Sequence, residues 1–167
     1  MSLDATGDAI DIGAFWRTLG ERAIGATVVT TAGAEGPNGF LGLSAAHVCA
    51  SPPTMVVSVD KKTSALEGIL ESGGFAVNFL PEGTAALARA FGGKTDEDRA
   101  ARFVEGEWDT LATGAPVYGA ALGVFDCEVD QVVDRGNVAL VIGTVKGVKA
   151  AGDGAPLVFF RGKFLSD

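Results

Sequence analysis

Two lysines and two hydroxyl side chains stand together at residues 60–64, where an extended stretch gives way to a helical pattern. The order is Asp60, Lys61, Lys62, Thr63 and Ser64. The first turn of a helix offers unpaired N–H groups and the positive end of the helix dipole, so nearby cations and hydroxyls make it a site for an anion. A ligand phosphate is one interpretation. The other is that Ser64 only caps the helix and the lysines are solvated.

Residues 39–47 carry two glycines, several small side chains and one hydroxyl within a predicted strand over residues 40–49. Glycines weaken a strand but let a flat ligand lie against its backbone. The alternative is a glycine-rich strand that crosses another strand closely. The residues by themselves support the two interpretations equally.

His47 is the only histidine, and in the predicted strand it shares parity with Leu41, Leu43, Ala45 and Cys49. A single histidine on such a face is more often a hydrogen-bonded packing residue than a catalytic acid. A metal site or a Ser-His-Asp triad would depend on this one residue. The sequence therefore predicts neither a metal site nor a catalytic side chain.

The two cysteines, Cys49 and Cys127, lack metal-ligand spacing, and one pair is too few for a disulfide scaffold. We expect buried thiols, although a disulfide between them stays open. The two tryptophans and the ten phenylalanines are expected in the core. Asp126 and Glu128 are expected on the polar face of a strand.

Hydrophobic periodicity and turn residues indicate the elements that must position these groups. Helices are expected at residues 11–23 and 84–91. A further helix is expected to begin at Ser64, which forms a capping-box pattern with Glu67. Residues 92–109 are expected to be a loop or lid with little core. Strands are expected at 24–31, 40–49, 54–60, 75–80, 120–133, 138–149 and 156–164. Strands joined by hairpin-like turns, such as 134–137, predict a mainly β fold: an antiparallel barrel with a few flanking helices.

A chain of 167 residues fits one domain, with residues 1–10 expected to be a flexible N-terminus. The net charge is −8 and no stretch concentrates lysine and arginine, which argues against nucleic acid or an anionic membrane as partner. The N-terminal residues lack the basic and apolar regions of a signal peptide, and no apolar run reaches the roughly 20 residues of a membrane span. We therefore expect a cytoplasmic protein.

An ordered set of short segments resembles the flavin reductase-like, FMN-binding split-barrel family. The resemblance runs from about residue 15 to residue 165, and the set as a whole is more specific than any one segment. Its segments are 26–31, 39–44, 51–53 leading into 56–60, 62–64, 72–78, 87–92, 102–103 with Trp108, 113–117, 127–129 and 156–158.

This resemblance implies a split β-barrel, antiparallel and Greek-key-like, that forms a homodimer with its flavin near the subunit interface. The flavin would be FMN, or alternatively FAD, with NADH or NADPH as co-substrate. Backbone N–H groups of residues 41–45 would bond the flavin ring, and the hydroxyl-rich turn would hold its phosphate. The cofactor-binding residues implied are Leu41, Gly42, Leu43, Ser44, Ala45, Ser58, Val59, Asp60, Lys62, Thr63, Ser64 and Phe91.

The chain departs from the family pattern at two places. Members commonly carry a Thr-x-Ser-Ser-Phe-like run where residues 41–45 stand, so some side-chain contacts to the flavin are absent while the backbone contacts remain. Many reductases of the family have a Gly-Asp-His turn whose histidine is linked to nicotinamide binding. Here the turn is Arg135-Gly136-Asn137, which leaves the nicotinamide side to Asn137 and His47.

The first functional hypothesis is an oxidoreductase that passes a hydride from NAD(P)H to a flavin and supplies a partner monooxygenase with reduced flavin. Hydride transfer needs stacked, oriented rings rather than an acid, a base or a nucleophile, which suits a chain with few titratable candidates. The second hypothesis is an FMN-binding electron carrier that another protein reduces. The third is a structural barrel that has lost its flavin.

Overall fold

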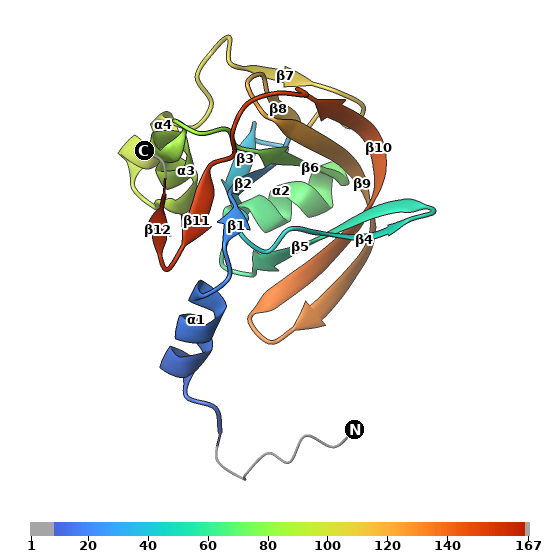
Figure 1. The fold of residues 1–167 in the computed structure, drawn as a ribbon. Coiled ribbons are helices and arrows are strands. Elements are labelled where there is room, and N and C mark those ends of the chain that lie inside the picture. The colour runs from blue at the N-terminus through green and yellow to red at the C-terminus, as the bar shows by residue number, and fades with distance from the viewer. Residues whose placement is uncertain (1–8, 166–167) are drawn as a thin grey trace.

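The computed structural model describes residues 9–165 and shows a strongly curved antiparallel sheet with helices at its side and across its middle (Figure 1). The first half contains α1 (Ile12–Gly20), β1 (Ile24–Gly25), β2 (Thr27–Thr31), β3 (Asn38–Leu41), β4 (Ala46–Ala50), β5 (Pro53–Asp60), α2 (Ser64–Ser72) and β6 (Gly74–Phe79). The second half contains α3 (Ala85–Gly92), α4 (Asp96–Ala100), β7 (Trp108–Thr110), β8 (Pro116–Tyr118), β9 (Gly123–Arg135), β10 (Val138–Ala150), β11 (Val158–Phe160) and β12 (Lys163–Phe164).

The main sheet has seven strands in the order β3-β2-β6-β9-β10-β5-β4, and all of its neighbours are antiparallel. The mainly β prediction with a few flanking helices is confirmed. The sheet is not closed, because β3 and β4, consecutive in the chain, lie at its opposite edges. Within residues 9–165, no helix combines the length and apolar character needed to cross a membrane.

The core fills the concave side of the sheet, where α2 lies across the middle of the molecule (Figure 1). The largest buried side chains there include Phe75, Ile69 and Val57. Gly68 brings α2 close to β2, because a Cβ at this position would lie 2.9 Å from the Thr31 methyl group. The helix ends at Gly73, whose φ of +72° favours glycine.

The strand predicted over residues 40–49 is wrong: the chain leaves the sheet at Gly42 and pairs again only from Ala46. Gly42 N–H donates to the carbonyl of Thr27 at 2.9 Å, and the Thr27 hydroxyl donates to the Gly42 carbonyl. β4 then pairs with β5 only over Pro53–Val56, and a register shift follows His47. The strand parity expected for His47 is therefore lost, and its side chain is exposed.

The apolar side of α1 is exposed, so the expectation that Trp16 belongs to the core is wrong. No residue of α1 is buried, and Phe15 and Trp16 are 55% and 62% exposed. The helix projects from the body of the molecule (Figure 1). Of the N-terminus expected to be flexible, residues 1–8 lie outside the described part of the chain, and Ala9 and Ile10 are exposed without regular structure.

Residues 92–109 were expected to have little core, and this is also wrong. They contain α4 and return Phe103 and Trp108 to pack against Phe91. The Phe91 and Phe103 ring centroids are 5.2 Å apart in an edge-to-face arrangement, and Tyr118 extends the cluster. Such pairs are the geometry that aromatic quadrupoles favour.

Asp126 is fully buried instead of lying on a polar strand face, whereas Glu128 is exposed as expected. The Asp126 carboxylate accepts hydrogen bonds from the N–H groups of Ala112 and Thr113 at 2.6 and 2.8 Å and from the Thr113 hydroxyl. A buried carboxylate needs such partners. Asp126 therefore fastens the loop before β8 to the centre of the sheet.

Both cysteines are free thiols, in different surroundings. Cys127 is buried as expected, and burial together with the neighbouring Asp126 raises the pKa of its thiol to about 12. Cys49 lies exposed on β4, so the expectation of two buried thiols is wrong for this residue.

Native protein should therefore react with a disulfide reagent such as dithionitrobenzoate at pH 8 at Cys49 alone, because the attacking species is the thiolate. Cys127 should react only after unfolding. Absorbance counts the thiols, and Cys49→Ser is the control, which should abolish the fast phase. Two rapidly reacting thiols in the native protein would contradict this account.

Candidate functional site

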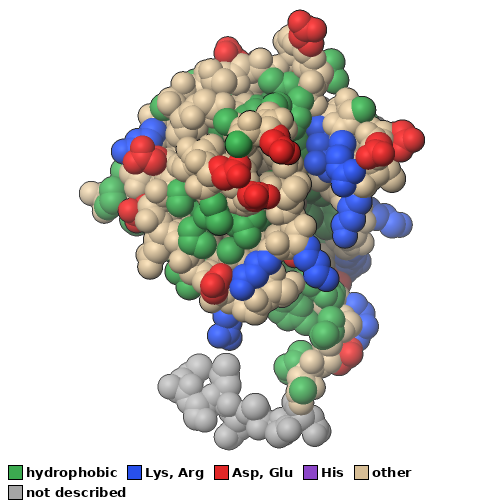
Figure 2. Space-filling model, turned by 180° about the vertical axis from the view of Figure 1, so that it is seen from behind, with side chains coloured by type: hydrophobic (Ala, Val, Ile, Leu, Met, Phe, Trp, Pro, Cys, Tyr) green, Lys and Arg blue, Asp and Glu red, His purple; other side chains and the backbone are tan. Residues whose placement is uncertain are grey.

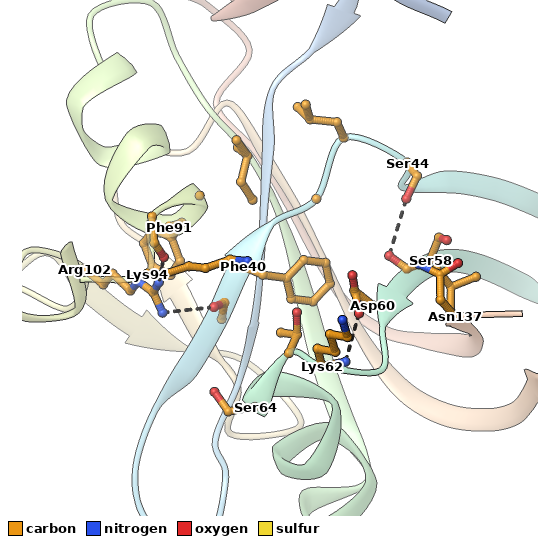
Figure 3. A pocket seen from close by; sticks show the side chains of 18 of the residues that line it. Phe40, Ser44, Ser58, Asp60, Lys62, Ser64, Phe91, Lys94, Arg102 and Asn137 are labelled. Carbon is orange, nitrogen blue, oxygen red and sulfur yellow. Dashed lines mark hydrogen bonds between the residues drawn. The ribbon is translucent and has the colours of Figure 1, made fainter. Parts of the chain in front are cut away.

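A cavity of about 580 Å³ opens between β3 and the turn that joins β5 to α2 (Figure 3). It occupies the split in the sheet, because β4 pairs only with the first half of β5 and leaves the edge from Ser58 to Asp60 uncovered. A cavity of this size suits a small-molecule ligand. The lining residues are Trp16, Gly39, Phe40, Leu41, Gly42, Leu43, Ser44, Ser58, Asp60, Lys62, Thr63, Ser64, Phe91, Gly92, Gly93, Lys94, Arg99, Arg102, Asn137 and Val138.

The charge of the cavity is opposite to that of the chain. Four cationic side chains line it, Lys62, Lys94, Arg99 and Arg102, against the single carboxylate of Asp60. The whole chain carries a net charge of −8. Seen from behind, basic side chains gather on the side of α3 and α4 (Figure 2). A cationic cavity in an acidic protein favours an anionic ligand.

The turn from β5 into α2 presents its polar groups to this cavity. The Asp60 side chain accepts from Lys62 N–H at 2.9 Å, and the Asp60 carbonyl accepts from Thr63 N–H at 2.9 Å. Thr63 is the N-cap, but its side chain makes no capping hydrogen bond. The helix thus begins with N–H groups and a hydroxyl that an anion can use.

The capping box predicted at Ser64 is wrong, because the helix begins at Ser64 itself and Thr63 holds the cap position. The Ser64 hydroxyl oxygen instead accepts from the side-chain amide of Asn38 at 3.0 Å. Ser64 still lines the cavity. The hydrogen bond between Asn38 and Ser64 therefore joins the start of β3 to the start of α2.

Ten of the twelve residues implied as cofactor-binding line the cavity, from the strand end at Leu41 to Phe91. The two others do not: Val59 is buried in the core, and Ala45 packs against it. Of the two nicotinamide-side residues, Asn137 lines the cavity and His47 does not. Asn137 sits in the two-residue turn between β9 and β10, which Gly136 permits with a φ of +57°.

Arg102 is the main lining residue that the sequence interpretation missed. Its guanidinium donates to the carbonyls of Ala90 at 2.8 Å, Gly93 at 2.7 Å and Gly39 at 3.4 Å. It also lies 5.5 Å from the centroid of the Phe91 ring. Burial lowers the pKa of Arg102, and Arg99 adds to this, whereas Asp98 opposes it. Within the described residues Arg102 has no ion pair, so its charge remains available to the cavity.

Lys94, Arg99 and Phe40 were also missed: Lys94 and Arg99 lie in the stretch expected to be a loop or lid, and Phe40 lies in the glycine-rich segment but was not among the residues implied as cofactor-binding. Phe40 projects into the middle of the cavity and Lys94 stands beside Arg102 (Figure 3). Arg99 is paired with Asp96 at 3.0 Å at the surface. The cations within residues 94–102 were the sequence signal that could have indicated this side of the cavity. Acidic residues stand between them in the sequence and mask the positive charge.

These groups fit a flat ligand that carries a phosphate. The hydroxyl of Thr63, the charge of Lys62 and the start of α2 can hold the anion, while residues 41–44 offer backbone and aliphatic surface to a ring. Among the described residues, no three histidine, cysteine or acidic side chains gather as a metal site would require. The fold and cavity therefore define a split barrel that binds a nucleotide-like molecule.

The chain belongs to the flavin reductase like domain family, whose model matches residues 19–166. It is 36% identical over 141 residues to the FMN reductase (NADH) RutF of Ancylobacter novellus, covering 83% of this chain and 75% of the relative. The FMN reductase (NADH) RutF of Agrobacterium fabrum is 38% identical over 135 residues, covering 80% and 76%. The family resemblance read from the sequence is confirmed.

Solved structures agree with this assignment. The flavin reductase PheA2 has a TM-score of 0.83 at 30% identity, with 94% of this chain and 98% of that chain covered. Nitrilotriacetate monooxygenase component B from Mycobacterium thermoresistibile has a TM-score of 0.82 at 30% identity, covering 93% and 86%. The split-barrel fold is thereby confirmed.

Replacing Arg102 by methionine should lower the free energy of unfolding by about 3 kcal/mol, because buried carbonyls lose their donors. Urea denaturation measures the change. Arg99→Gln is the matched control, since Arg99 lines the same cavity with its ion pair at the surface, and it should change stability by less than about 0.5 kcal/mol. An equal loss of unfolding free energy in both variants would show that the hydrogen bonds of Arg102 do not stabilise the fold.

Proposed function

We propose that the protein is an NAD(P)H:flavin oxidoreductase that transfers hydride from NADH or NADPH to FMN, with FAD as the alternative flavin. The observation that carries the proposal is the cationic cavity beside an uncovered strand end in a chain of net charge −8. The similarity to proteins named FMN reductase (NADH) supports the same reaction.

The flavin phosphate is held by Lys62, the Thr63 hydroxyl and the first N–H groups of α2, where a dianion meets both a cation and the helix dipole. The flavin ring would lie along residues 41–44, where the chain leaves the sheet after Gly42, the residue that Thr27 still holds with two hydrogen bonds. Leu41 and Leu43 supply aliphatic surface to the ring. Asn137 closes the opposite side, at the turn between β9 and β10.

A flavin bound there would supply the hydride-accepting chemistry, with the dihydronicotinamide as hydride donor and water as the source of the proton. The chain's own residues bind, orient and exclude solvent. Phe40 and the two leucines restrict water around the ring. Asp60, the one carboxylate in the lining, is engaged with the Lys62 N–H, so it orders the phosphate turn and needs to move no proton.

An electron carrier whose FMN is reduced by another protein is the second candidate. Asn137 favours it, because the turn between β9 and β10 lacks the histidine that many reductases of the family carry there and that is linked to nicotinamide binding. A barrel without flavin is less compatible with the cationic cavity and its open helix N-terminus.

One assay separates these candidates. The purified protein is mixed with FMN or FAD and with NADH or NADPH, and nicotinamide oxidation is followed by absorbance. We expect rapid oxidation that depends on added flavin. Flavin binding without oxidation would favour the carrier, and a protein that binds no flavin would reject both.

Thr63→Val and Lys62→Gln should each weaken FMN binding by about tenfold, because a charge-assisted phosphate contact is lost. Equilibrium dialysis or flavin fluorescence gives the dissociation constant. Lys61→Gln is the matched control, since Lys61 pairs with Asp134 at 3.3 Å and does not line the cavity. If all three variants bound FMN as the wild type does, the phosphate would have to lie elsewhere.

We further propose that the protein is a cytoplasmic homodimer that supplies reduced flavin to a partner monooxygenase. Exposed apolar side chains on β4, β9 and β10 support an interface, namely Val48, Val132, Val133 and Val148. The similarity to a component of nitrilotriacetate monooxygenase supports the partner. Sedimentation equilibrium tests the dimer, and a monomer at micromolar concentration would refute it.

A further inference from the structure

A separate pocket, of about 400 Å³, lies beside β7, at the end of the molecule opposite to α1 (Figure 1). Aromatic, proline and acidic side chains line it. Among the described residues, none lines both this pocket and the larger cavity, which forms a groove in the split of the sheet. The pocket therefore has a chemistry of its own, which the binding of a flavin does not use.

Two aromatic rings line the pocket together. The ring centroids of Phe103 and Trp108 lie 5.0 Å apart, and the ring planes are inclined by 58°. Both residues are only partly buried. Pro37 and Pro116 extend the apolar lining. Aromatic faces attract cations, and the apolar surface around them suits the aliphatic stem of a long cationic side chain.

The charge of the pocket is negative and uncompensated. Glu105 and Asp109 line it, both are exposed, and no lysine or arginine of the described chain joins them. The Glu105 carboxylate has no hydrogen bond or ion pair within residues 9–165, and Asp109 accepts from the Thr110 N–H at 2.8 Å. Two carboxylates beside two aromatic rings complement a guanidinium, which stacks on rings and binds carboxylates with its N–H groups.

β7 has a free edge along this pocket. In the part of the chain that the structure describes, β7 pairs only with β8. Gly119 N–H donates to the Glu107 carbonyl at 2.8 Å, so the backbone groups of Glu107 and Asp109 face β8. By the alternation of an antiparallel pair, those of Trp108 and Thr110 face away from it.

The pocket follows this edge rather than one face of the strand. All three residues of β7 line it, although successive side chains of a strand point to opposite faces. An extended peptide that pairs with β7 can therefore direct a side chain into the pocket. Backbone groups of this kind match another polypeptide better than a small organic cation.

We infer that this pocket is a docking site for a partner protein that adds an extended segment to the edge of β7 and places an arginine side chain between the aromatic rings and the two carboxylates. The inference does not depend on the proposed function. Phe103 and Trp108 also pack against Phe91, which lines the groove. A partner docked here lies against the outer side of the groove wall.

The probe is the peptide acetyl-Thr-Val-Arg-Val-Thr-amide, followed by the fluorescence of Trp108 in the Trp16→Phe chain, where it is the remaining tryptophan. The peptide should change this fluorescence saturably. The same peptide with citrulline, which is neutral and similar in shape to arginine, should bind about tenfold more weakly. No binding, or equal binding of the two peptides, would overturn the inference. So would fluorescence that depends on protein concentration alone, because a second copy of the chain would then fill the pocket.

Two variants test the carboxylates. Glu105→Gln and Asp109→Asn should each weaken binding of the arginine peptide by about threefold, as expected for exposed charge pairs. Asparagine keeps the acceptor for the Thr110 N–H. The matched control is Glu107→Gln, because Glu107 is exposed between these residues and does not line the pocket. An equal loss in Glu107→Gln would show that net charge rather than the pocket attracts the peptide, and would refute the site.

A third peptide tests the pairing with β7. Methylation of all its backbone nitrogens removes the N–H donors and keeps the arginine side chain. This peptide should bind about tenfold more weakly than the unmodified one, because the strand edge supplies backbone hydrogen bonds. Unchanged affinity would mean that no strand is added to β7, contrary to the inference.

Discussion

The groove exists because the chain leaves the sheet at Gly42. Two hydrogen bonds between Gly42 and Thr27 hold the strand end in place, and a side chain at this position would collide with Val29, whose methyl group would lie 2.6 Å from the new Cβ. Glycine is therefore required there. Because the next strand begins only at Ala46, the edge of β5 beyond Val56 stays uncovered. A barrel that closed at this point would have no space for a ligand.

The opposite side of the groove depends on a buried cation. Arg102 binds three backbone carbonyls from β3, α3 and the segment after α3, so one side chain sets the distance between elements far apart in the sequence. Carbonyl partners satisfy its N–H groups without cancelling its charge. The result is a wall that is both rigid and attractive to anions.

Local signals were sufficient for much of the fold and for one end of the groove. The positions of most main-sheet strands along the chain followed from β-branched runs and turns. The turn at residues 60–64, noted for its helix start beside hydroxyls and lysines, lines the cavity. Features that depend on distant contacts were not visible. The chain leaves the sheet at Gly42 because Thr27 holds this residue with hydrogen bonds. Asp126 can be buried because the loop at Thr113 donates hydrogen bonds to its carboxylate. Arg102 has its role because carbonyls on other elements accept its N–H groups. Trp16 is exposed although it belongs to a helical hydrophobic pattern of the kind that usually packs into a core.

The contrast between the acidic chain and its cationic groove bears on how nucleotides arrive and depart. The Debye length is roughly 8 Å at physiological salt, so the net charge of −8 and the cations of the groove both act on a nucleotide mainly within that distance. Capture is then a short-range event confined to the groove mouth. Once a departing anionic flavin has left the groove, the acidic surface of the protein repels it. Charges that never touch the ligand therefore assist its release.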